Sequence, residues 1–178
     1  MNAIIVPETM RREIEAFVFL EARLADESRY SEWEALVTDD MHYWVPNGPA
    51  NYDPATRLSY INDNRARLAT RIRQLQTGLR HAQTPASPMR RLVSNIEVLA
   101  IVELSSSSTV GAVTVDSVTV GANQVVYERN AQSTGRIRLW PGRVTYRLRR
   151  VEGDWRMSAK TIELLIVDDA LPNLTFLI

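Results

Sequence analysis

The stretch of sequence that decides the fold is TGRIRLWPGRVTYRLRRV, residues 134–151. Apolar side chains alternate with arginines in both of its halves: Ile137 and Leu139 oppose Arg136 and Arg138, and Val144, Tyr146 and Leu148 oppose Arg143, Arg147 and Arg149. A period of two residues is typical of a β-strand with one buried face. Between the halves, residues 140–143 (WPGR) predict either a type II turn or a bulge that bends one long strand.

The same period extends to both sides of this stretch. Residues 90–104 (RRLVSNIEVLAIVEL), 109–130 and 155–167 (WRMSAKTIELLIV) are each predicted to form β-structure. The serine run at 105–108 is interpreted as a turn, and residues 152–154 (EGD) as a tight hairpin turn. Gly111 and Gly121 are candidate β-bulges. These features predict a long antiparallel meander.

The first half of the chain has helical spacing instead. Helices are predicted over residues 6–28, 29–37 and 58–78, with Gly78 as a C-terminal stop for the third. Residues 47–57 and 81–89 are predicted loops because they are rich in proline and other turn residues. A short strand is expected at residues 42–46 (HYWVP), which Pro46 ends.

Helices first and a meander afterwards indicate an α+β fold. We expect the N-terminal helices to pack on one face of a curved antiparallel sheet, so that the two enclose a cone with an interior pocket. With 178 residues, the chain is expected to form one domain over residues 1–178.

Composition excludes several functions. The chain has no cysteine, which excludes disulfides, thiolate zinc sites and cysteine-ligated iron–sulfur clusters. Basic and acidic residues balance at 21 each, and a neutral chain lacks the basic surface that general nucleic-acid binding needs. No secretory signal and no run of 18 apolar residues occurs, so we expect a cytoplasmic protein with no membrane contact.

Chemistry-bearing residues are densest in TDDMHYWVP, residues 38–46, where Asp39, Asp40 and His42 lie within four positions. Two carboxylates beside an imidazole could form an acid/base pair. Aspartates between a helix and a strand are also ordinary turn residues, and we favour this structural interpretation. An iron site is a poor alternative, because it needs two histidines and a carboxylate on one face, and the only histidines are His42 and His81.

Two further groups of residues have a structural and a functional interpretation. Trp33, Trp44, Trp140 and Trp155 could line a ligand cavity, although such residues are more often core or interface anchors. Arg90 and Arg91 could bind an anion, although paired arginines at a strand start more often face a carboxylate or a partner. The sequence contains no Gly-rich phosphate loop, nucleophile elbow or dinucleotide fingerprint.

Five segments, in this order and at this spacing, resemble the small (beta) subunit of aromatic-ring-hydroxylating dioxygenases. They are FLEARLADESRYSEWEALVTDDMHYWVP (19–46), RRLVSNIEV (90–98), VVYERN (125–130), GDWRMSAKTIEL (153–164) and LPNLTFLI (171–178). The resemblance covers roughly residues 13–178. Residues 105–124 and 47–55 depart from the family's pattern and leave the partner and the aromatic substrate unassigned.

The resemblance implies the cone-shaped fold of nuclear transport factor 2, also called cystatin-like, which ketosteroid isomerase and scytalone dehydratase share. It implies a heterohexamer of three large (alpha) and three small subunits. In this family the large subunit carries the Rieske [2Fe–2S] cluster and the mononuclear Fe(II), while the small subunit supplies no ligand and supports assembly. On this interpretation the chain has no catalytic, cofactor-binding or metal-binding residue. The alternative is a stand-alone isomerase or dehydratase of the same fold that uses Asp39, Asp40 and His42 inside the cone.

The arginine face and the apolar tail suggest how such an assembly is held together. We expect the arginine face of residues 136–149 to meet solvent or partner chains. The tail LPNLTFLI is expected to be exposed in a lone monomer and buried at an interface. Copies of this chain are expected to meet around a threefold axis.

Overall fold

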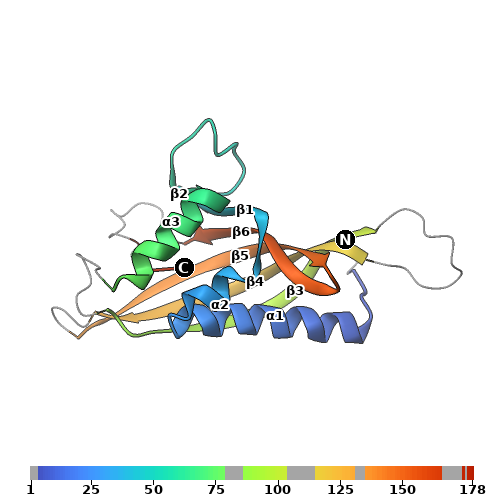
Figure 1. Cartoon of the computed structure of the whole chain (residues 1–178), viewed down its shortest axis with the longest axis horizontal. Helices are drawn as coiled ribbons and strands as arrows, with labels where there is room; N and C mark the ends of the chain where they lie inside the picture. The colour runs from blue at the N-terminus through green and yellow to red at the C-terminus, as the bar shows by residue number, and fades with distance from the viewer. Residues whose placement is uncertain (1–3, 79–85, 104–114, 131–134, 166–173, 175) are drawn as a thin grey trace, which may run out of the picture.

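The computed structural model describes residues 4–78, 86–103, 115–130, 135–165, 174 and 176–178. Figure 1 shows helices lying against a long, twisted sheet. The elements follow the expected order, helices mostly before strands: α1 (Glu8–Asp26), α2 (Tyr30–Glu34), β1 (Val37–Pro46), β2 (Ser59–Asn64), α3 (Arg65–Gln76), β3 (Met89–Glu103), β4 (Val115–Arg129), β5 (Ile137–Val151) and β6 (Asp154–Leu164). The predicted α+β architecture is confirmed.

The strands form one sheet in the order β2-β1-β6-β5-β4-β3, with β2 and β3 at its edges. All neighbouring pairs are antiparallel except β1 and β6, which are parallel. The sheet is therefore mixed, whereas the meander alone predicted a purely antiparallel one. The parallel pair arises because the first strand of the chain lies beside the last, a contact between distant segments that local periodicity does not encode.

One face of the sheet packs against the helices, and we call it the inner face. Ile14 and Val18 of α1 share a buried core with Val120 of β4 and Tyr146 of β5. Side chains alternate along a strand, so every second residue points to the opposite, outer face. This distinction decides where each candidate residue lies.

The predicted helix over residues 58–78 is a strand followed by a helix. Asn64 ends β2 and caps α3, because its side-chain oxygen accepts a hydrogen bond from Arg67 N at 3.0 Å. Ile61, which fits a helical stripe with Leu68, instead pairs with Val45 of β1. The end of the helix was predicted correctly, since Gly78 has φ +70° and donates from its N–H to the carbonyl of Leu75.

The stretch TDDMHYWVP lies inside a strand and does not lead into one. The second helix ends at Glu34, and β1 begins at Val37. Met41, Tyr43 and Val45 are buried in the core. Asp40, His42 and Trp44 alternate with them and so belong to the outer face.

Strand β5 runs through WPGR without a turn or bulge, and its register with β4 is continuous from Ile137 to Arg149. Gly142 makes this possible, because a Cβ there would lie 2.6 Å from the carbonyl oxygen of Glu163 on β6. The unbroken strand corrects one face assignment. Ile137 and Leu139 lie on the outer face with Arg143, and not on the inner face with Val144.

The bulge prediction at Gly121 is wrong, because β4 keeps its register with β5 there. The extra residue is on β3, where Ser94 pairs with Asn123 but Glu97 pairs with Gly121. Asn95, inside this bulge, has φ +53°. The hairpin turn over residues 152–154 is confirmed by the pairing of Val151 with Asp154.

Two predictions fall outside the described residues, the serine turn at 105–108 and the bulge at Gly111. Of the tail, the structure describes Leu174 and residues 176–178. Among the described helices, none combines the length and the apolar character needed to cross a membrane.

Candidate functional site

The interior of the cone contains a charged side chain from α1, Glu21, which is fully buried. Its Oε1 accepts hydrogen bonds from Trp33 Nε1 at 2.6 Å and from Lys160 Nζ at 2.8 Å. Its Oε2 accepts one from the hydroxyl of Tyr146 at 3.3 Å. Because three donors from α2, β5 and β6 converge on one carboxylate, this group of four residues ties the helices to the sheet.

A second buried ion pair lies beside it. Arg91 of β3 donates from Nε to Asp26 Oδ1 at 2.8 Å, and its backbone N–H donates to Asp26 Oδ2 at the same distance. Its Nη2 donates to the carbonyl oxygen of Leu177 at 3.0 Å. Arg91 therefore faces a carboxylate, as the structural interpretation of this residue expected, and it also holds the end of the chain.

The end of the chain fills the interior. Phe176, Leu177 and Ile178 are at most 1% exposed. The ring of Phe176 meets Trp140 edge to face at a centroid distance of 5.7 Å. The hydroxyl of Tyr43 donates to the carbonyl oxygen of Ile178 at 2.6 Å and accepts from its N–H at 2.9 Å. The expectation that these residues are exposed and reserved for an interface is wrong, because the chain's own core buries them.

Electrostatic interactions keep the buried Glu21 carboxylate ionised. Burial raises the pKa of Glu21, but the charges of Lys160 and Arg91 and the hydrogen bonds from Lys160 and Trp33 bring that pKa below its ordinary value. Burial lowers the pKa of Lys160, and the Glu21 carboxylate offsets part of that effect. Desolvation raises the pKa of Tyr43 and of Tyr146, so both hydroxyls stay protonated and act as donors.

Asp40 and His42 lie on the outer face, away from the cone interior. They line a surface hollow of about 550 Å³ together with Trp44, Arg147 and Arg149. Asp40 accepts two hydrogen bonds from Arg149, at 2.7 and 2.8 Å, and His42 Nε2 lies 2.8 Å from Asn62 Oδ1. A hydrogen bond from Thr38, helped by the Arg149 charge, holds the pKa of Asp40 below its ordinary value.

The structure does not bring the three candidate acid/base residues together. Asp39 is exposed and is not among the residues that line the hollow. The imidazole of His42 stacks on Trp44 at a centroid distance of 6.2 Å. His81 lies outside the described residues. The arrangement joins β1 to β5 by an ion pair and leaves an arginine, Arg147, facing solvent in the same hollow.

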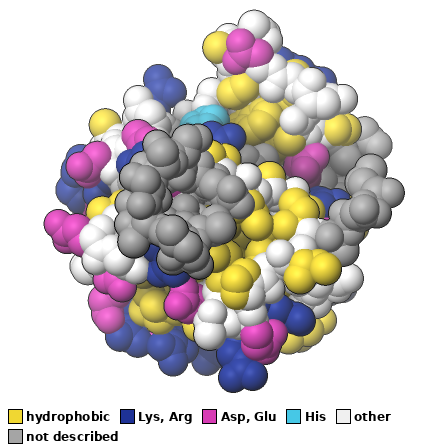
Figure 2. All heavy atoms as spheres, turned by 90° about the vertical axis from the view of Figure 1, so that its right-hand side faces the viewer, with side chains coloured by type: hydrophobic (Ala, Val, Ile, Leu, Met, Phe, Trp, Pro, Cys, Tyr) yellow, Lys and Arg dark blue, Asp and Glu magenta, His cyan; other side chains and the backbone are white. Residues whose placement is uncertain are grey.

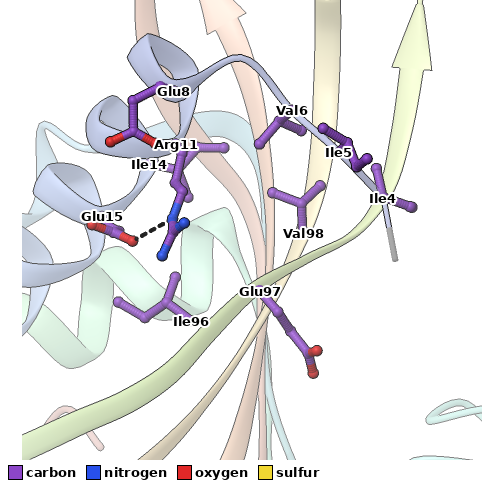
Figure 3. A pocket seen from close by; sticks show the side chains of 10 residues that line it. All are labelled: Ile4, Ile5, Val6, Glu8, Arg11, Ile14, Glu15, Ile96, Glu97 and Val98. Carbon is purple, nitrogen blue, oxygen red and sulfur yellow. Dashed lines mark hydrogen bonds and ion pairs between the residues drawn. The ribbon is translucent and has the colours of Figure 1, made fainter. Parts of the chain in front are cut away.

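Another hollow, of about 340 Å³, lies between the N-terminal segment, α1 and β3 (Figure 3). Ile4, Ile5 and Val6 line it on one side and Val98 on another, with the Arg11–Glu15 ion pair at its rim. Figure 2 views the right-hand end of Figure 1 and shows hydrophobic side chains gathered in the middle of that surface with charged side chains below them.

Two of the four tryptophans lie in the centre of the core, and the other two lie at its edge. Trp33 and Trp140 are buried and donate from Nε1 to Glu21 and Glu128. Trp44 donates to Ser59 Oγ at 2.8 Å, and Trp155 donates to Glu13 at 3.2 Å. They act as anchors between elements, as the structural interpretation expected.

Within the described residues, no group of three or more His, Asp or Glu side chains could hold a metal ion. The donor set of the whole sequence also does not fit a Rieske cluster, which needs two cysteines, because the chain has none.

Sequence reasoning missed the pair Glu21 and Lys160. Two signals could have found it. Glu21 lies in the apolar stripe of the first helix, between Val18 and Leu24, where a charge needs a buried partner. Lys160 is the only lysine in a chain that otherwise uses arginine, which marks its position as unusual.

Comparisons with known proteins agree on one family. A family model described as the ring hydroxylating beta subunit matches residues 20–168. The small oxygenase component of the p-cumate 2,3-dioxygenase system of Pseudomonas putida is 32% identical over 152 residues, covering 84% of this chain and 76% of that protein.

Solved structures show the same fold. The beta subunit of benzoate 1,2-dioxygenase from Burkholderia mallei superimposes with a TM-score of 0.66 at 20% identity, covering 99% of each chain. An NTF2-like protein with a cystatin-like fold from Novosphingobium aromaticivorans gives a TM-score of 0.53 at 17% identity, covering 88% of this chain and 82% of that one. These two likenesses confirm the predicted cone-shaped fold.

Proposed function

The chain belongs to the ring-hydroxylating beta-subunit family, and we propose that it is the non-catalytic small subunit of an aromatic-ring-hydroxylating dioxygenase. In this role it supports assembly with a large catalytic subunit in the cytoplasm, for the breakdown of an aromatic compound. A single domain over residues 1–178 performs this role. The relative from the p-cumate 2,3-dioxygenase system is itself described as a small oxygenase component.

The observation that carries the non-catalytic role is the filled interior. Enzymes with a cone-shaped fold bind substrate between the sheet and the helices, where a general base needs open space beside it. Here Phe176 and Ile178 occupy part of that space, and they contact Trp140 and Tyr43. The carboxylate that points inward, Glu21, already accepts hydrogen bonds from three donors. These hydrogen bonds make the ionised carboxylate a structural part of the core.

The large subunit would supply the metals. We propose that the Rieske [2Fe–2S] cluster and the mononuclear Fe(II) reside there and that this chain ligates neither. The lack of cysteine and the presence of only two histidines in the sequence support this division of labour. A heterohexamer of three large and three small subunits, with the small subunits around a threefold axis, is the proposed stoichiometry.

One observation favours a second candidate, a stand-alone isomerase or dehydratase. Asp40 and His42 share a surface hollow of about 550 Å³, which is large enough for a small substrate. Against this candidate, Arg149 holds the Asp40 carboxylate in its ionised form, and Asp39 does not line the hollow.

Two measurements separate the candidates. The chain is co-expressed with a tagged large oxygenase subunit of the same organism, and the native mass and the iron content of the purified complex are determined. A heterohexamer whose iron requires the large subunit supports the proposal, and a chain that never associates with it overturns the proposal.

The variant His42→Ala is then assayed in that complex. If His42 is structural, complexes that still form retain turnover per iron, although their yield or stability falls. A loss of several orders of magnitude in an intact, iron-loaded complex favours a catalytic role. The variant Asn62→Ala is the matched control, because it removes the hydrogen-bond partner of His42 and leaves the imidazole in place.

A further inference from the structure

Exposed apolar side chains gather on the outer face of the sheet, at the end where β3 and β5 begin. Register places Arg90, Tyr127 and Leu139 side by side across β3, β4 and β5, and Arg129 beside Ile137 in the next row. Leu92 follows Arg90 by two residues and shares its face. We call these six residues the β3–β5 patch.

The apolar members of the patch are open to solvent in the lone chain. Leu92 and Ile137 are 63% and 64% exposed, and Leu139 and Tyr127 are 46% and 38% exposed. Their strand neighbours Val126 and Trp140 point inward and are buried. Single exposed apolar residues are ordinary, but four on adjoining strands form one contiguous surface, and such a surface marks a contact with another molecule.

The charge of the patch narrows the choice of occupant. Both of its charged residues are arginines, and among the described residues no carboxylate pairs with either. Arg90 donates only to the neighbouring carbonyl of Met89, at 2.9 Å. The side chain of Arg129 makes no hydrogen bond or ion pair within the described part of the chain. The patch therefore fits an apolar surface that carries aspartate or glutamate at its rim.

A second copy of this chain fits the patch poorly. A patch-to-patch contact would bring like-charged arginines together, which is unfavourable, and copies around a threefold axis would instead place the patch against a different surface of the next copy. Many acidic side chains elsewhere on the described surface already pair with arginines of the same chain, as in Glu8–Arg12 and Glu34–Arg65.

We infer that the β3–β5 patch is the surface on which the large oxygenase subunit docks. The large subunit would present apolar side chains to the patch, with carboxylates around them that pair with Arg90 and Arg129. This inference rests on the proposed function, and it adds the face of the chain at which the two subunits meet. The arginines set the orientation, and the apolar rows supply the buried area.

The test uses variants of the patch beside matched controls on the opposite edge of the sheet. Leu139→Asp and Arg129→Glu alter the patch. Leu58→Asp, at a residue 86% exposed beside β2, and Arg67→Glu on α3 make the same chemical changes elsewhere. Each variant is titrated against a tagged large subunit, and its melting temperature is recorded.

Both patch variants are expected to bind the large subunit about tenfold to a hundredfold more weakly than the parent. Both controls are expected to bind like the parent. If the patch variants also bind like the parent, the large subunit docks elsewhere, and the proposed function stands without this inference. If the parent itself does not bind, the proposed function and the inference both fail. If patch variants keep the large subunit but lose self-association, the occupant is a second copy.

A second measurement covers a patch variant that fails to fold. Hydrogen exchange and side-chain footprinting are compared for the parent chain alone and in complex with the large subunit. Protection of Tyr127, Ile137 and Leu139 in the complex, with no protection of Leu58, supports the inference. Equal labelling of the patch in both states overturns it.

Discussion

At the scale of single residues, the core of this protein depends on compensated charge. The cluster of Glu21, Lys160, Asp26 and Arg91 contains two carboxylates and two cations. Removing one member leaves a buried charge without its partner, which costs far more than losing an exposed ion pair. The cluster therefore specifies how α1 sits on the sheet, because only one placement of the helix satisfies all the donors.

The first prediction concerns Glu21→Gln. It should lower the free energy of unfolding by about 3–5 kcal/mol, because the Lys160 ammonium stays buried without a carboxylate. The double variant Glu21→Gln with Lys160→Met should recover part of that loss. Glu8→Gln, at an exposed ion pair with Arg12, should cost about 0–1 kcal/mol. Denaturant unfolding of the isolated subunit measures all of these, and equal effects at Glu8 and Glu21 would contradict the assigned role.

The second prediction concerns pH. The pKa of Glu21 in the folded chain lies below its ordinary value of 4.5. The stability that its ionisation contributes is thus complete above the ordinary pKa and is lost as pH falls through the lower folded value. Glu21→Gln should flatten the fall of the unfolding midpoint as the pH decreases below the ordinary value of 4.5. Parallel slopes for parent and variant would show that other carboxylates control acid unfolding.

At the scale of elements, the sequence predicted the type of structure better than its boundaries. Ile61 fits two patterns, a helical stripe with Leu68 and an alternating strand, and only its pairing with Val45 selects the strand. The faces of β5 were misassigned for a related reason. A turn or bulge at WPGR shifts the alternation by one, whereas the observed strand is continuous and places Ile137 and Leu139 outside.

The third prediction tests why β5 can stay straight there. Gly142→Ala should destabilise the subunit by about 1–3 kcal/mol, because its Cβ would lie 2.6 Å from a backbone oxygen of β6. Gly121→Ala is the matched control in the neighbouring strand, where a Cβ would meet the tip of the flexible Leu99 side chain at 2.9 Å. The melting temperature should fall more for Gly142→Ala. The reverse order would show that the close approach of β5 to β6 does not require a glycine at position 142.

At the scale of the whole molecule, the candidate site could be predicted only in part. Composition identified what the chain lacks, since cysteine and histidine can be counted in the sequence. The position of Asp40 and His42 on the outer face depends on how β1 enters the sheet, which parallel pairing with a strand over a hundred residues away decides. The apolar tail had two possible destinations, an interface or the chain's own core, and local sequence does not distinguish them.

The fourth prediction concerns metal. Purified alone, the chain should carry neither stoichiometric iron nor the spectrum of a Rieske cluster, because it has no thiolate and only two imidazoles. Metal analysis and absorption spectroscopy of the isolated subunit provide the measurement. One tightly bound iron per chain would overturn the proposed division of roles between the subunits.

The fifth prediction decides whether the end of the chain serves the subunit or the assembly. Phe176 is 1% exposed and packs edge to face on Trp140, so Phe176→Ala should leave a cavity between the chain end and the sheet. The expected loss is about 3–5 kcal/mol in the free energy of unfolding of the isolated subunit. Phe19→Ala, at a residue of the same type that is 52% exposed on α1, should cost much less. If Phe176→Ala leaves the isolated subunit as stable as the parent and weakens only the complex, the tail belongs to an interface after all. Loss of stability in the isolated chain instead means that the residues filling the cone are part of its fold. The core then occupies the space in which an enzyme of this shape would bind a substrate.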